Sequence, residues 1–150
     1  MSQSLVKNTV QLIFSTKYRQ PLITPDIEPE LHGYLFATCK DLDCKPIRVG
    51  GDIDHVHILC GLSKKLALMK LLELLKAHSS RWIKTKGEAY RRFYWQDGYA
   101  AFSVSRWDVD MIAAYIDNQK EHHRKQGYQD EVRELLVKHG LEYDERYLWD

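Results

Sequence analysis

The sequence has little of what marks a disordered chain or a membrane anchor. Only four prolines and eight glycines occur in 150 residues, of which 44% are hydrophobic, so a disordered chain is excluded. No apolar run approaches the roughly 20 residues that cross a bilayer, and residues 1–4 lack a signal-peptide pattern. We therefore expect a soluble cytoplasmic protein with no membrane partner, built as a single domain over residues 1–150.

Cysteine is also scarce. The three thiols, Cys39, Cys44 and Cys60, show no CxxC spacing, and an odd number is typical of a reducing compartment. We expect these residues to lie in the core or near the surface rather than to act as metal ligands or nucleophiles.

The net charge of +1 conceals an uneven distribution. Residues 64–92 hold nine Lys and Arg against two Glu, whereas residues 108–150 hold eleven acids against six bases. A polyanionic partner would meet the first segment and avoid the second. A solvated helix face would carry the same pattern, so charge alone leaves both interpretations open.

Hydrophobic periodicity predicts the order β-α-β-β-α-β over the first two thirds of the chain. The strands are expected at 8–16, 45–50, 53–62 and 100–105, and the helices at 29–41 and 65–85. The Gly50-Gly51 pair predicts the hairpin turn between the second and third strands. This order is typical of the α+β, ferredoxin-like split βαβ fold, with helices on one face of an antiparallel four-stranded sheet.

Helices are predicted again beyond the fourth strand. Asp108 is the expected N-cap of a helix that continues to about Gln126, with Gly127 as its stop. A last amphipathic helix is expected at about 129–139, ending at Gly140, before an acidic, aromatic tail.

Two patterns could carry chemistry. In His55-Val56-His57, alternation along a strand places both imidazoles on one face, where they could share a divalent cation. In the helix at 108–126, Tyr115 and Gln119 are four residues apart and stack on one face, flanked by His122 and His123. Each pattern alone is also compatible with ordinary structural residues.

Together these patterns resemble the single-tyrosine HUH transposases, which move insertion sequences as single-stranded DNA. The matching segments are His55-Val56-His57 and Tyr115-Ile116-Asp117-Asn118-Gln119, and residues 95–105 also look like the segment of that family that precedes the nucleophile helix. The resemblance covers roughly residues 8–125, and no motif is matched beyond about residue 128.

The resemblance implies a role for each residue. His55, His57 and Gln119 would be ligands of Mg²⁺ or Mn²⁺, and Tyr115 would be the nucleophile that forms a 5′-phosphotyrosine and leaves a free 3′-hydroxyl. Such a cation with open positions neutralises a phosphodiester and orients the scissile bond. The intermediate stores the energy of the cleaved linkage, so strands can be rejoined without ATP.

The partner implied is single-stranded DNA with hairpins at the ends of the element. Basic residues beside aromatic ones suit such a partner because they combine phosphate neutralisation with base stacking. The candidate DNA-binding residues are Lys70, Arg81, Lys84, Arg91 and Arg92.

Three other interpretations stay open. The protein could be a domesticated relative with the same chemistry, a noncatalytic ferredoxin-like module that binds single-stranded nucleic acid, or a metal-dependent phosphoesterase that uses water. Because excision must bring two ends together, we also expect a homodimer with active sites shared between its subunits.

Overall fold

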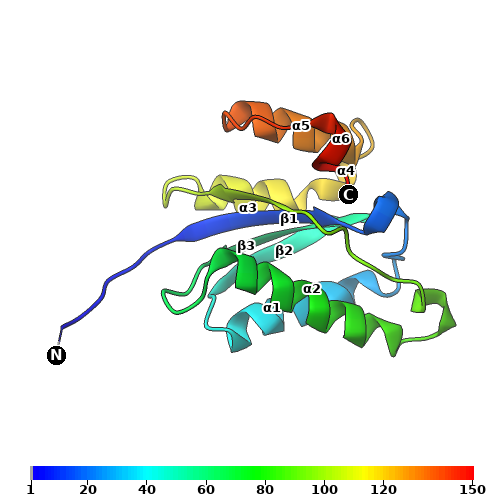
Figure 1. Ribbon diagram of the computed structural model, residues 1–150, viewed down its shortest axis with the longest axis horizontal. Coiled ribbons are helices and arrows are strands. Elements are labelled where there is room, and N and C mark those ends of the chain that lie inside the picture. Colours follow the sequence, from blue (N-terminus) through cyan, green and yellow to red (C-terminus); the bar gives the residue numbers. More distant parts are fainter. Residues whose placement is uncertain (1) are drawn as a thin grey trace.

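The protein folds around one four-stranded sheet, and the computed structural model describes residues 2–150 (Figure 1). The strands lie in the order β2-β3-β1-β4, and each neighbouring pair is antiparallel. Their bounds are β1 (Thr9–Ser15), β2 (Pro46–Asp52), β3 (His55–Gly61) and β4 (Ala100–Ser103). This topology confirms the predicted ferredoxin-like α+β fold.

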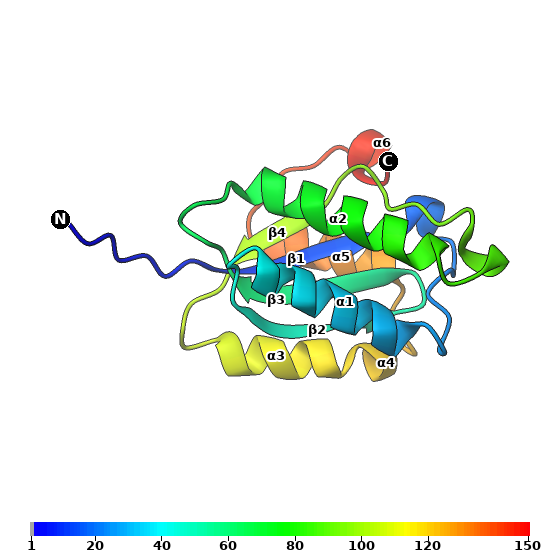
Figure 2. The same cartoon turned by 90° about the horizontal axis from the view of Figure 1, so that it is seen from below.

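One face of the sheet is covered by α1 (Glu28–Asp41) and α2 (Leu68–Lys84), as Figures 1 and 2 show. Alternate residues of the two central strands point into this layer, where they pack against apolar residues of both helices. They are Val10, Leu12 and Phe14 of β1 and Val56, Ile58 and Cys60 of β3. All three cysteines are free and buried in this layer, as expected.

The opposite face is covered by α3 (Val109–Asp117) and α5 (Tyr128–Lys138). Leu59 of β3 packs against α3, and Ile13 of β1 packs against α5. The central strands are therefore buried on both sides. Short elements complete the chain: α4 (Gln119–His122), α6 (Glu145–Leu148) and 3-10 turns at Lys17–Arg19 and Glu88–Tyr90.

The predicted position of the hairpin turn is wrong. Gly50 and Gly51 both lie inside β2, and the chain reverses at Ile53 and Asp54. The reason for Gly50 is a close approach of α3, since a Cβ at this position would lie 2.7 Å from both Cγ2 and the carbonyl oxygen of Ile116. Gly51 has a φ of +154°, which side chains rarely tolerate.

The single helix predicted from Asp108 to Gln126 is also wrong, because the chain breaks after Asp117. Asp108 occupies the N-cap position of α3 without a side-chain capping bond, and Asn118 separates α3 from α4 with a φ of −96° and a ψ of 15°. Gly127 is the N-cap of α5 rather than the stop of the preceding helix. The break turns Gln119 towards the sheet, where it is buried.

The remaining bounds agree with the sequence to within three residues, but α6 was not anticipated in the C-terminal tail. The helices formed by residues 2–150 include none with both the length and the apolar character that a bilayer span requires.

Candidate metal and nucleophile site

Strand β3 presents its two histidines to the sheet face that carries α3 and α5. His55 and His57 are both 0% exposed, whereas the intervening Val56 packs into the opposite layer. Their ring centroids are 5.2 Å apart. The alternation of a strand thus places the two imidazoles side by side, as the sequence predicts.

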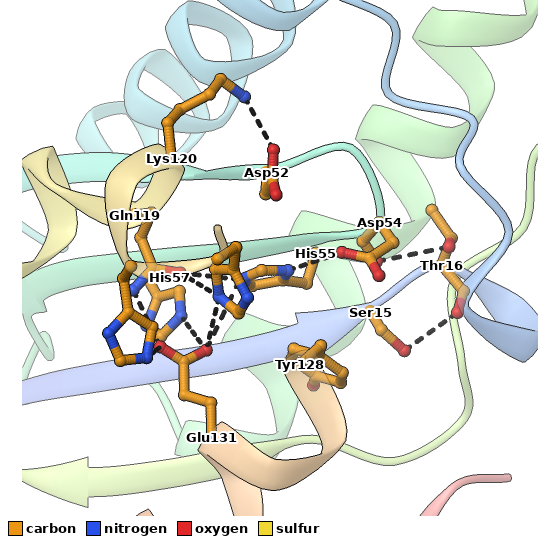
Figure 3. A network of polar contacts seen from close by, with 12 residues as sticks. Ser15, Thr16, Asp52, Asp54, His55, His57, Gln119, Lys120, Tyr128 and Glu131 are labelled. Atoms are coloured by element: carbon orange, nitrogen blue, oxygen red, sulfur yellow. Dashed lines mark hydrogen bonds and ion pairs between the residues drawn. The ribbon is translucent and has the colours of Figure 1, made fainter. Parts of the chain in front are cut away.

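The break after α3 brings Gln119 to the histidine pair (Figure 3). Gln119 Oε1 lies 2.8 Å from His55 Nε2, and the Tyr115 ring centroid lies 5.8 Å from that of His57. The four predicted site residues therefore meet, and they do so within one chain. The expectation of sites shared between subunits is not needed to assemble them.

The ring of His55 is fixed from behind by Asp54. The Nδ1–H of His55 donates to the Asp54 carboxylate over 2.7 Å, so in the neutral ring Nε2 carries a lone pair. That lone pair faces the carbonyl oxygen of Gln119, because the amide nitrogen of Gln119 donates to Glu131 over 2.9 Å. A metal ion between these two acceptors would satisfy both of them.

Glu131 of α5 is a site residue that sequence reasoning missed. Its carboxylate is 1% exposed and accepts the hydroxyl hydrogen of Tyr115. Oε1 lies 3.2 Å from His57 Nε2 and 3.1 Å from His123 Nε2. The signal was its position, since Glu131 interrupts the apolar stripe that Tyr128, Val132 and Leu136 form on α5.

The electrostatics of the site follow from burial around one anion. Burial lowers the pKa of His57 to about 4, so this imidazole is neutral at pH 7. Burial would raise the pKa of Glu131, but hydrogen bonds from His123 and His57 outweigh it and hold the pKa well below its usual range. Burial, together with the Glu131 carboxylate, raises the pKa of Tyr115, whose phenol is therefore protonated.

The donor set fits a divalent cation. His55 Nε2, His57 Nε2 and a carboxylate oxygen of Glu131 all lie within 4.8 Å of one another, and Gln119 Oε1 adjoins them. Neutral imidazole, which burial favours at His57, is the form that binds metals. His57 also has a buried Nδ1 with no hydrogen-bond partner among the described residues.

A second tyrosine lies close to the histidine pair. The ring centroid of Tyr128 is 4.6 Å from that of His55, but its hydroxyl donates to Gln96 Oε1 over 3.3 Å. Tyr115 is part-buried and contacts Glu131, whereas Tyr128 is only 6% exposed. Of these two phenols, Tyr115 is therefore the one directed at the cluster of metal-binding groups.

The candidate DNA-binding residues lie elsewhere. Lys70, Arg81 and Lys84 belong to α2, which covers the sheet face opposite the histidine pair. Lys84 Nζ lies 4.1 Å above the centroid of the exposed Tyr94 ring. Arg91 and Arg92 follow in an exposed loop.

Comparisons with known proteins identify the family and similar folds. A family model described as "Transposase IS200 like" matches residues 4–119. A solved candidate transposase from Deinococcus radiodurans R1 shares 23% identity with a TM-score of 0.61, covering 79% of this chain and 98% of that chain. A REP-associated tyrosine transposase bound to a REP hairpin shares 13% identity with a TM-score of 0.60, covering 82% of this chain and 74% of that chain. A comparison with curated proteins gives no match.

Proposed function

Because the chain belongs to the IS200-like transposase family, we propose that it is a DNA transposase that cleaves and rejoins single-stranded DNA through Tyr115. The observation that carries this proposal is the meeting of Tyr115, Gln119 and the histidine pair in one cluster. These groups come from distant segments of the chain, since His55 and Gln119 are 64 residues apart in the sequence. A ferredoxin-like fold has no general need to collect them at one point.

Tyr115 is the nucleophile of the proposed reaction. Its Oη attacks the phosphorus of a phosphodiester, and the new Oη–P bond forms as the P–O3′ bond breaks. The phenolic proton is lost to an acceptor, and the departing 3′ oxygen takes up a proton to become a hydroxyl. Rejoining is the reverse of cleavage. The 3′-hydroxyl attacks the phosphorus of a 5′-phosphotyrosine, the P–O3′ bond forms, and the Oη–P bond to tyrosine breaks.

His55, His57 and Gln119 hold Mg²⁺ or Mn²⁺ in this proposal. A bound cation of this kind would act as a Lewis acid: it would neutralise charge on the phosphate and orient the scissile bond. Asp54 keeps the Nε2 lone pair of His55 directed into the site. Burial also lowers the pKa of His57 and so keeps this imidazole uncharged.

The partner of the proposed enzyme is single-stranded DNA with a hairpin. The REP-associated relative is described as bound to a hairpin, and the basic face of α2 with Tyr94 offers this chain phosphate contacts beside a stacking surface. Two element ends require two hairpin sites, which a homodimer would supply, and the proposed location of this homodimer is the cytoplasm.

The test is covalent capture. A labelled single-stranded oligonucleotide with the hairpin of the element's end, incubated with the protein and Mg²⁺ or Mn²⁺, should give an adduct that survives denaturation. Peptide mapping should place the nucleotide on Tyr115. The perfect duplex of the same sequence should be a poor substrate, since the proposed contacts need unpaired or self-folded DNA.

Each alternative gives a different result. Binding without cleavage or adduct would identify a noncatalytic single-strand-binding module, and cleavage without an adduct would identify a phosphoesterase that uses water. Equal cleavage of duplex and single strand would contradict the single-strand specificity.

A further inference from the structure

Glu131 is a fully buried acid at the centre of four imidazoles. Besides its contacts with His57 and His123, its Oε1 lies 3.6 Å from His55 Nε2, and its Oε2 lies 3.4 Å from His122 Nε2. Glu131 lies on α5, beyond the segment that the family model matches. Nothing in that match therefore assigns it a role.

The charge of Glu131 has no permanent cation beside it. Within residues 2–150, its ion pairs involve histidines alone. Lys120, on the neighbouring α4, is paired with Glu28 and Asp52 instead. A buried carboxylate without a cationic partner is costly, so this geometry favours a bound cation beside Glu131.

The separations of the donor atoms match those around one small cation. Ligands held at about 2.1 Å in octahedral geometry lie about 3 Å apart when they are adjacent. The observed separations are 2.8 Å between His55 Nε2 and Gln119 Oε1, 3.2 Å between His57 Nε2 and Glu131 Oε1, and 3.6 Å between His55 Nε2 and Glu131 Oε1.

The donor chemistry favours the same assignment. Two neutral imidazoles and one amide oxygen carry no charge, whereas Mg²⁺ is usually bound in proteins through one or two carboxylates. Glu131 supplies that missing anion through Oε1. Its second oxygen, Oε2, accepts hydrogen bonds from Tyr115 and Gln119, so one side chain contacts the nucleophile and the ligand set together.

We propose that Glu131 is a fourth, anionic ligand of the metal centre and that it anchors α5 to the site. This inference rests on the proposed function, because it takes His55, His57 and Gln119 as the other ligands. It makes the C-terminal helix a part of the metal site, and it gives the carboxylate a positioning role towards the Tyr115 hydroxyl.

The test measures binding of Mn²⁺ alone to the full chain by calorimetry, without DNA. Glu131→Gln keeps the shape but removes the charge, and it should weaken Mn²⁺ binding by at least about 10-fold. Glu134→Gln is the matched control, since Glu134 is an exposed acid on the same helix, and it should bind as the wild type does. His57→Ala is the reference for loss of a ligand.

The outcomes separate the two proposals. Wild-type binding by Glu131→Gln together with weak binding by His57→Ala would overturn the role of Glu131 and leave the metal site intact. Unchanged binding by His57→Ala, or no binding by the wild type, would overturn the metal site itself.

A second measurement needs no variant at all. Bound Mn²⁺ should broaden the amide resonances of Glu131 and Val132 as strongly as those of β3. Sharp resonances in α5 beside broadened ones in β3 would overturn the inference, even if Glu131→Gln failed to fold.

Discussion

The hydroxyl of Tyr115 donates a hydrogen bond to the carboxylate of Glu131, sixteen residues further along the chain. Tyr115 lies within the segment that matches the family model, and Glu131 lies beyond it. The contact ties the proposed nucleophile to a helix in which the sequence offers no family motif. Burial and this carboxylate both raise the pKa of Tyr115, so the phenol is protonated in the free protein.

Replacing Tyr115 with Phe should abolish the covalent adduct while leaving hairpin binding nearly unchanged, because the variant lacks only the attacking oxygen. Tyr128→Phe is the matched control, since it removes a hydroxyl that contacts Gln96 instead. Denaturing electrophoresis with labelled DNA should show the adduct for the control alone. An adduct formed by Tyr115→Phe would show that another residue is the nucleophile.

Removal of the proposed metal site should stop cleavage. EDTA, or the double change His55→Ala with His57→Ala, should reduce cleavage to background, and Gln119→Ala should weaken it because one neutral oxygen is lost. Cleavage rates at increasing Mn²⁺ concentration should show the Gln119 variant recovering part of its activity. Full activity of the double histidine variant would show that His55 and His57 have only a structural role in the core.

Gly50→Ala should destabilise the fold and displace the helix that carries Tyr115. The added Cβ would contact Ile116 Cγ2 and its carbonyl oxygen at 2.7 Å, and overpacking of this kind costs about 1–3 kcal/mol. Urea unfolding should report this loss. Gly33→Ala in α1 is the control, because an added Cβ would meet no atom within 4 Å outside its own turn of helix, and the helix should gain about 0.5–1 kcal/mol. Equal stability of both variants would contradict the close approach of α3 to β2.

Loss of charge on α2 should weaken hairpin binding without affecting the metal site. Arg81→Ala combined with Lys84→Ala should lower affinity and reduce the slope of log affinity against log salt by about 0.7–0.9 for each phosphate contact removed. Lys138→Ala, at the end of α5, should leave both quantities unchanged. The measurement is hairpin binding over a range of salt concentrations, and an unaltered slope would exclude this face from the DNA-binding surface.

Mixing two inactive variants should not restore cleavage. Tyr115 lies beside His57 of its own chain. A mixed dimer of one subunit with His55→Ala and His57→Ala and one subunit with Tyr115→Phe therefore contains no complete site. Cleavage assays after mixing should stay at background, although sedimentation should show a dimer. Partial recovery would demonstrate that α3 is exchanged between subunits.

Local rules explain which parts of the site could be predicted. The pairing of His55 with His57 depends only on strand alternation, and helical spacing was the signal that paired Tyr115 with Gln119. Both survive in the structure, even though the helix breaks between Tyr115 and Gln119. The interruption of the helix at Asn118 could not be predicted in this way, because it accompanies a tertiary contact of Gln119 with His55 on the sheet.

The parts that escaped prediction depend on tertiary contacts. Gly50 and Gly51 have the composition of a turn, but the requirement for glycine comes from Ile116 and from backbone geometry inside β2. Glu131 reaches His57 from 74 residues away, and no local pattern encodes that meeting. An acid on an apolar helix stripe was the available clue.

Helix α5 also sets where the chain can be shortened. Its Tyr128, Val132 and Leu136 cover Ile13 and Phe102, which are 0% and 4% exposed. A truncation just after residue 119, where the family match ends, would expose this half of the sheet and leave an apolar surface prone to self-association. Trimming for crystallisation or fusion to another protein should therefore preserve every residue through Lys138, and a proteolytic nick between α4 and α5 should release no stable smaller body.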